Sequence, residues 1–338
     1  MIITKTPFRM SFFGGGTDMP SFFNSHGGAV ISTTFDKYCY VNVRHMPPFH
    51  PYISELVHNR FERVNDIEEI EHPLIRECMR LHDIHEIRLT YEGDLPARTG
   101  LGTSSTFAVG MLNAFCALKG KMMSKRQLAQ EAIHVERDIL HEHGGWQDQV
   151  AAAYGGFNRI DFHDHDFSVR PIIISPDRKK ELDDNLMLFY TGMQRFSSEI
   201  QADTFGKPVD KTKQLLDMLA LVDEAEKVLT DKNVSLKEFG RLLDTTWKLK
   251  RGTGPKVSNG SIDELYGMAI KAGAVGGKLL GAGGGGFLLF YCEKEMQPRL
   301  INALDKLMIV PFNFESDGAQ VLYYAPVEYS PRKEIVLK

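Results

Sequence analysis

Residues 94–106 combine glycines and hydroxyl side chains in a pattern that could bind phosphate. Gly100 and Gly102 let the backbone approach a ligand closely, and hydroxyl residues follow where a helix must begin. Unpaired N–H groups and the helix dipole at such a turn favour an anion. The Gly-Lys-Ser/Thr ending of a Walker loop is missing. An ordinary capped helix after a glycine turn would explain the same residues about equally well.

Three carboxylates stand where they could take part in chemistry. Asp18 ends the glycine turn at 14–18 and offers two acceptors to sugar hydroxyls, although it could equally cap a tight turn. Glu136 falls on the apolar stripe of a helix predicted over 124–141, where a carboxylate needs a cation unless the helix is slightly rotated. Asp148 lies between amides and an apolar helix, which suits a dry, oriented base, and it could instead cap that helix.

A second glycine-rich segment, Gly281 to Gly286, formally matches the pattern GxGxxG. The apolar run after it is typical of a strand, whereas dinucleotide binding requires a helix at that point. Glycines between two strands predict a flat wall of backbone instead.

The elements that must position these residues follow from hydrophobic periodicity. Period-two alternation predicts a strand at 2–12, residues typical of strands predict others at 29–44 and 87–92, and an apolar run predicts a buried strand at 186–191. Helical periodicity and capping signals predict helices at 70–82, 104–118, 124–141, 208–230, 235–250, 261–273 and 296–307. The helix at 104–118 is apolar on all sides and should be buried, which would hold its polar start rigidly. A loop is expected at 45–60, and the stretch from about 172 to 182 contains a polar passage, 175–180, that could join two halves.

Length and composition limit the function classes. A chain of 338 residues predicts two domains, and a net charge of −4 with scattered basic residues indicates no nucleic-acid partner. The four cysteines lie far apart and form no CxxC pair, which favours reduced thiols in the cytoplasm. No signal peptide or run long enough to span a bilayer is recognised, so no membrane partner is expected. Monomer and homodimer both stay open.

Three glycine signatures in this order resemble the GHMP small-molecule kinases. The first looks like Pro7 through Asp18, the second like Pro96 through Ser105, and the third like Lys278 through Gly286. Their order and separation span most of the chain. The resemblance implies a two-domain α+β fold. Its parts would be a half like ribosomal protein S5 domain 2 at 1–180, a ferredoxin-like half at 181–330 and a tail at 331–338.

The resemblance also implies ATP and Mg²⁺ as cofactors and assigns roles to residues. The ATP phosphates would be held by Pro96, Gly100, Leu101, Gly102, Thr103, Ser104 and Ser105. Ser104 and Glu136 match the Mg²⁺ ligands of the family. Asp148 matches the carboxylate that orients or deprotonates the acceptor hydroxyl, and Arg9 would temper charge on the transferring phosphoryl group. The sugar would meet Gly15, Gly16, Thr17, Asp18, Arg195, Gly283 and Gly284.

Within the family, the first and third motifs and residues 189–200 look most like the branch that phosphorylates D-glycero-D-manno-heptose 7-phosphate at its anomeric hydroxyl. The expected substrate is therefore a small sugar phosphate, with Arg195, Lys250 and Arg251 as candidates for its distal phosphate. A kinase for an unphosphorylated hexose of the galactose or fucose type is one alternative. A non-catalytic nucleotide- or sugar-binding homologue is another, disfavoured because Arg9, Ser104, Glu136 and Asp148 are all present.

Overall fold

The computed structural model describes residues 1–97, 99–193, 211–327 and 329 of the chain. The larger of its two sheets has nine strands. Its main path runs through β13 (Gln320–Tyr324), β1 (Ile2–Phe13), β2 (Gly28–His45), β5 (Ile87–Gly93), β3 (Ser54–Val57) and β4 (Phe61–Val64). Beside this path, β2 also pairs with β6 (Phe157–His163) and β12 (Phe314–Glu315), and β6 pairs with β7 (Asp166–Pro171).

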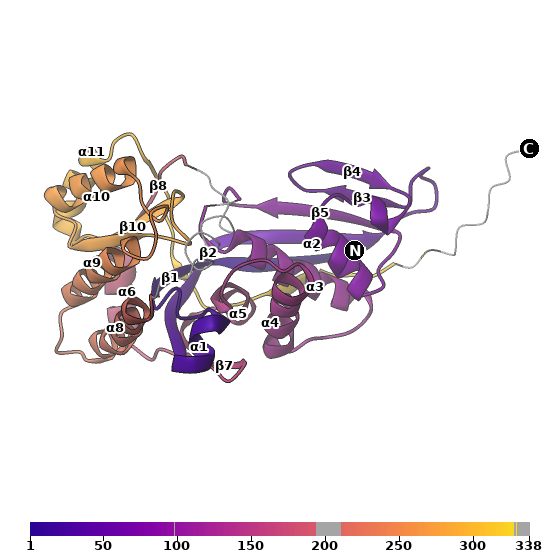
Figure 1. The fold of residues 1–338 in the computed structure, drawn as a ribbon. Helices are drawn as coiled ribbons and strands as arrows, with labels where there is room; N and C mark the ends of the chain where they lie inside the picture. The colour runs from indigo at the N-terminus through magenta and orange to yellow at the C-terminus, as the bar shows by residue number, and fades with distance from the viewer. Residues whose placement is uncertain (98, 194–210, 328, 330–338) are drawn as a thin grey trace, which may run out of the picture.

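Helices cover one side of the large sheet (Figure 1). They are α2 (Pro73–Leu81), α3 (Thr103–Leu118), α4 (Lys125–Ile133) and α5 (Gln147–Tyr154). The apolar α3 is buried almost throughout and packs directly on β1 and β2. Gly110 permits this close approach, because Thr4 Oγ1 donates to the Gly110 carbonyl at 2.9 Å. The middle of α3 is thereby fixed relative to β1.

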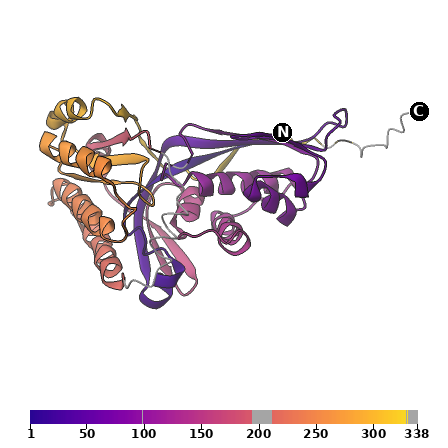
Figure 2. The same ribbon diagram turned by 45° about the horizontal axis from the view of Figure 1, so that its top comes forward.

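The second sheet and its helices form the other end of the molecule (Figure 2). The strand order is β11 (Met308–Ile309), β8 (Leu186–Tyr190), β10 (Phe287–Tyr291) and β9 (Gly276–Leu279). The accompanying helices are α6 (Pro176–Asp184), α8 (Thr212–Thr230), α9 (Lys237–Arg251), α10 (Gly260–Ala272) and α11 (Gln297–Ala303). Helix α9 packs on β9 and β10. Shorter elements are α1 (Pro20–His26), a π-helix at His134–Ile139 and two 3₁₀ turns, Ile67–Glu69 and Lys294–Met296.

The two ends of the molecule share part of one hydrophobic core. Phe239 of α9 packs edge-on against Phe12 and Phe13 at the end of β1, with ring centroids 5.3 and 5.1 Å apart. Nearby, Lys278 Nζ of β9 donates to the Phe12 carbonyl at 2.7 Å. These contacts fix the second sheet and its helices against the end of β1, close to Arg9.

The predicted α+β class is confirmed, and three local predictions are wrong. Residues 45–60, expected as a loop, contain β3, a strand too short to give a clear alternation. Residues 175–180 begin α6, where Ser175 caps the helix by accepting from the Arg178 amide. Helix α10 is capped by Asn259, whose side chain accepts from the Ile262 amide, so the helix starts before Ser261.

The end of the described chain returns to the large sheet. Strand β13 pairs with β1, with Tyr324 opposite Ile2, and β12 pairs with β2, with Phe314 opposite Phe35. The predicted second half, 181–330, did not anticipate this return, because alternation identifies a strand without identifying its partner. The division near residue 180 stays a prediction, and the tail at 331–338 lies outside the described residues.

None of the helices in the described part of the chain combines the length and apolarity needed to cross a bilayer. All four cysteines are free and buried.

Replacing Gly110 by valine should lower the free energy of unfolding by about 1–3 kcal/mol, because the added methyl groups meet Thr6 and Val41 of the strands. Gly267→Ala in α10 is the matched control, since nothing lies within 4 Å of its added Cβ. That change should leave stability equal or raise it by up to about 1 kcal/mol. Urea denaturation followed by circular dichroism measures both. Equal midpoints for Gly110→Val and the unaltered chain would contradict the described packing.

Candidate active site

Loop 94–106 connects β5 to the start of α3. Gly100 and Gly102 both have positive φ, 83° and 73°, and Gly102 is the N-cap residue of α3. The N-cap residue is a glycine, so it makes no side-chain capping hydrogen bond to the first turn. The backbone amides of this turn lie at the helix end that favours anions. Ser104 is exposed, and Ser105 is buried.

Arg9 of β1 and Asp148 of α5 form a two-pronged ion pair beside this loop. Arg9 Nε and Nη2 donate to the two carboxylate oxygens of Asp148 at 2.7 and 2.8 Å. Arg9 Nη1 also donates to the Gly100 carbonyl at 2.8 Å. Only 4% of the Arg9 side chain is exposed, against 24% for Asp148, so the carboxylate is fixed while part of it faces open space. Asp148 does not cap α5.

Asp18 is buried and holds the turn at 14–18 to the segment before α5. Its carboxylate accepts from the Gly16 amide at 2.8 Å and from the Gln147 amide at 3.2 Å. Burial raises the pKa of Asp18, the nearby Asp148 charge adds to that rise, and the amide hydrogen bonds oppose it. Asp18 therefore caps a turn, as one interpretation held, and its role toward a sugar stays a prediction.

Thr17, predicted to meet the sugar, has its hydroxyl engaged inside the fold. The Oγ1 atom donates toward the carbonyls of Gly14 and Ala29, at 2.8 and 2.9 Å, and accepts from the Ala29 amide. The residue is fully buried. A direct hydrogen bond to substrate would require breaking these contacts, so the hydroxyl shapes the turn. Gly15, another predicted sugar contact, is less closely packed, because the atom nearest to a Cβ built on it lies 3.7 Å away.

Loop 280–286, between β9 and β10, lies directly against loop 94–106. A Cβ on Gly281 would fall 2.2 Å from Gly100 Cα, and a Cβ on Gly286 would fall 2.0 Å from the Thr99 carbonyl oxygen. Both glycines have positive φ. The predicted wall of backbone thus packs on loop 94–106, at a separation that leaves no room for a side chain.

Gly283 and Gly284, the predicted sugar contacts in loop 280–286, are buried. The Gly284 amide donates to the Val257 carbonyl at 2.9 Å, and Gly283 packs on the same residue. Gly281 and Ala282 are the half-buried part of this loop. Of the other predicted sugar contacts, Arg195 lies outside the described residues.

Glu136 is buried in the π-helix, so the alternative of a solvated edge residue is wrong. Its carboxylate accepts from Gln149 Nε2 at 2.5 Å, and no direct bond joins it to Ser104 within the described ranges. The Oε1 atom of the same glutamine is buried without a partner. The Glu136 carboxylate and Gln149 Oε1 offer oxygen atoms of the kind that a hard cation binds, so these two residues fit a Mg²⁺ site. The assignment of Ser104 and Glu136 as the Mg²⁺ ligands stays a prediction.

Two lysines, Lys250 and Lys278, lie near Arg9. Of the two, only Lys250 was a candidate phosphate-binding residue in the sequence. Lys250 Nζ donates to the carbonyls of Leu279 and Gly281. Burial lowers the pKa of Lys278 well below its ordinary value, and the charges of Lys250 and Arg9 act in the same direction. Arg251, in contrast, forms an ion pair with Asp263 at 3.0 Å. A lysine inside an apolar strand is the signal that could have identified Lys278.

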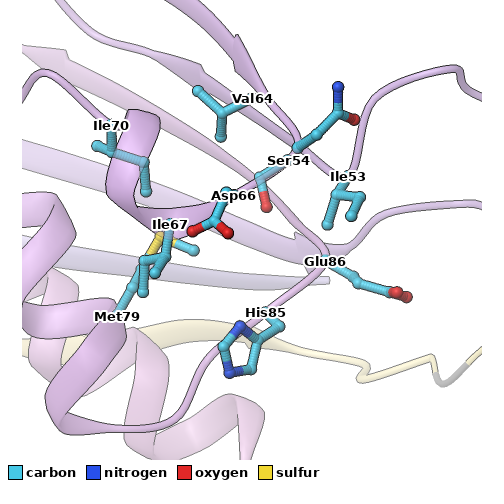
Figure 3. A pocket seen from close by; sticks show the side chains of 10 residues that line it. Ile53, Ser54, Val64, Asp66, Ile67, Ile70, Met79, His85 and Glu86 are labelled. Atoms are coloured by element: carbon cyan, nitrogen blue, oxygen red, sulfur yellow. The ribbon is translucent and has the colours of Figure 1, made fainter.

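A cavity of about 300 Å³ opens between β3, β4 and α2, away from the glycine loops. Figure 3 shows Ser54, Asp66 and His85 around it. The residues that line it include the carboxylates of Asp66 and Glu86 and no lysine or arginine. Phosphate groups would meet repulsion there, so the cavity does not compete with loop 94–106 as a nucleotide site.

Sequence comparisons agree with this geometry. The family model for the GHMP kinases N terminal domain matches residues 70–156, and the model for the GHMP kinases C terminal domain matches residues 232–310. The chain belongs to the GHMP kinases and is an ATP-dependent phosphotransferase with an alcohol group as acceptor.

The chain is also similar to individual sugar kinases. The chain is 29% identical to the D-glycero-alpha-D-manno-heptose 7-phosphate kinase of Campylobacter jejuni, over 94% of this chain and 98% of that one. It is 27% identical to the L-fucokinase/L-fucose-1-P guanylyltransferase of Bacteroides fragilis, over 84% of this chain and 34% of that one. The crystal structure of a D-glycero-D-manno-heptose 1-phosphate kinase from Bacteroides thetaiotaomicron superposes with a TM-score of 0.77 and 24% identity, over 98% and 100% of the two chains.

Replacing Gly100 by alanine should raise the KM for ATP by on the order of tenfold or more, because the new methyl group forces loops 94–106 and 280–286 apart. Its Cβ would lie 2.4 Å from the Leu280 carbonyl oxygen. Gly27→Ala is the matched control, with a similar φ of +70° and nothing within 4 Å. It should cost only about 1 kcal/mol of stability and leave the KM unchanged. Equal KM values for both variants would contradict the role given to this contact.

Proposed function

We propose that this protein transfers the γ-phosphoryl group of ATP to the anomeric hydroxyl of D-glycero-D-manno-heptose 7-phosphate. The observation that carries phosphoryl transfer is the Arg9–Asp148 pair, fixed against the Gly100 carbonyl beside the start of α3. The choice of sugar rests on similarity to the Campylobacter jejuni heptose 7-phosphate kinase over nearly the full length of both chains.

The residues divide the reaction between them. Amides of Gly100 to Ser105 and the start of α3 bind the ATP phosphates. The carboxylate of Asp148 orients the anomeric hydroxyl and accepts its proton as the oxygen forms a bond to the γ-phosphorus and the bond to ADP breaks. Arg9 keeps Asp148 in place and offsets charge that develops on the transferring group. Mg²⁺, held through Ser104 and Glu136, would supply charge neutralisation on the phosphates.

The alternative acceptor is an unphosphorylated hexose. It is favoured by the similarity to the Bacteroides fragilis L-fucokinase, which covers 84% of this chain. The two candidates differ in the need for cations at the far end of the sugar.

A coupled assay that follows ADP release should separate the candidates, with heptose 7-phosphate, galactose and fucose as acceptors. Heptose 7-phosphate should give the highest kcat/KM, because its distal phosphate adds charge-assisted contacts that a hexose lacks. Turnover of galactose or fucose without turnover of heptose 7-phosphate would overturn the proposed acceptor.

Asp148→Asn should lower kcat by on the order of 10²-fold or more, since the amide keeps the shape but cannot accept the proton. The same coupled assay measures it. Thermal unfolding must accompany the assay, because the substitution also removes the partner of a buried arginine. A folded variant with near-normal turnover would remove Asp148 from the mechanism.

Glu136→Ala should raise the Mg²⁺ concentration needed for half-maximal activity by on the order of tenfold, because a hard cation loses a charged ligand. Titrating Mg²⁺ at saturating ATP measures this. Asp138→Asn is the control, since Asp138 lies in the same π-helix but is exposed. An unchanged titration for Glu136→Ala, or an equal shift for both variants, would contradict the assignment.

A further inference from the structure

Lys250 occupies the last turn of α9 and faces the backbone that leads into loop 280–286. Its Nζ donates to the Leu279 carbonyl at 3.2 Å and to the Gly281 carbonyl. An ammonium group has three donors, so one N–H direction is left without a bond to the described residues. No carboxylate lies within ion-pair distance of Lys250 in the ranges that the structure describes. The neighbouring Lys248, in contrast, is exposed and paired with Asp244 at 2.6 Å.

The carbonyls that Lys250 holds belong to the stretch that touches loop 94–106. Gly281 packs on Gly100, and the Leu280 carbonyl faces Gly100 from the same side. The Gly100 carbonyl in turn accepts from Arg9. A continuous set of direct contacts therefore runs from Lys250 through two glycine backbones to the Arg9–Asp148 pair.

Charges around Lys250 come from every segment that meets at this point. Burial, together with the charge of Arg9, lowers its pKa to about 7, although the charges of Asp18 and Asp148 oppose the change. Lys278 of β9 is also nearby, with its pKa lowered well below the ordinary value by burial. Among the described residues, Lys250 and Lys278 have no carboxylate in direct contact, whereas Arg9 pairs with Asp148. A bound anion would supply the missing opposite charge.

We propose that Lys250 is a positioning residue that holds loop 280–286 against loop 94–106, so that nucleotide binding depends on the charge of this single ammonium group. The ligand class is a phosphoryl anion, namely the triphosphate of ATP. The proposal rests on the ATP site at loop 94–106, and it holds whatever sugar is the acceptor.

Nucleotide affinity should depend on pH because only the charged form of Lys250 completes the nucleotide site. Below pH 7 the lysine is protonated and donates to the carbonyls, so the nucleotide site is complete. As pH rises above about 7 the free protein loses this charge, and binding of the anion must then be accompanied by uptake of a proton from solvent. Nucleotide affinity should therefore fall with rising pH.

The test measures the affinity of a non-hydrolysable ATP analogue with Mg²⁺ by calorimetry, without any sugar, between pH 6 and pH 9. Lys250→Met should bind about tenfold or more weakly at pH 6, the loss typical of a charge-assisted contact. The unaltered protein should approach that weaker affinity by pH 9. Lys250→Arg should keep its affinity across the range, because arginine stays charged. Lys248→Met, the matched surface control, should follow the unaltered protein.

Two results would overturn the proposal. One is a folded Lys250→Met protein, by thermal unfolding, that binds the analogue within about twofold of the unaltered protein at pH 6. The other is a difference between these two proteins that stays constant from pH 6 to pH 9. A sugar panel without any turnover would instead count against the proposed function, and it would leave this binding result standing.

Discussion

The hydrogen bonds of the Arg9 guanidinium are the interactions on which the rest of the site depends. One buried side chain joins β1, the carboxylate of Asp148 on α5 and the Gly100 carbonyl of loop 94–106. A buried ion pair of this kind contributes little net stability, yet removing one partner typically costs about 3–5 kcal/mol because the other charge is left uncompensated. The pair therefore specifies an arrangement, because it holds the Asp148 carboxylate at a fixed place beside a helix start that favours anions.

A second constraint is the direct contact of two glycine backbones. Gly100 and Gly281 come from opposite ends of the molecule and meet with no space for a Cβ on either side. Since each position also has a positive φ, any other residue would add both strain and a clash. The third signature of the sequence thus packs directly on loop 94–106, the proposed phosphate site, and the predicted contact of Gly283 and Gly284 with the sugar stays a prediction.

Much of this could be read from the sequence because the signals are local. The buried helix α3 follows from its uniformly apolar residues, and the glycines before it follow from the turn they must make. Contacts between distant segments could not be read in the same way. Alternation does not reveal that β13 pairs with β1. Composition does not reveal that the Thr17 hydroxyl is hydrogen-bonded to the carbonyls of Gly14 and Ala29.

The charged residues illustrate the same limit in energetic terms. Glu136 on an apolar stripe is a local contradiction, so its need for a polar partner is evident from periodicity, although the identity of Gln149 is not. Lys250 gives no such signal, because a lysine in the last turn of a helix is favoured by the helix dipole alone. Only the fold brings it to the carbonyls of loop 280–286 and into the field of Arg9 and Asp148. The position of Lys250 beside the proposed nucleotide site therefore follows from tertiary structure and not from the local sequence.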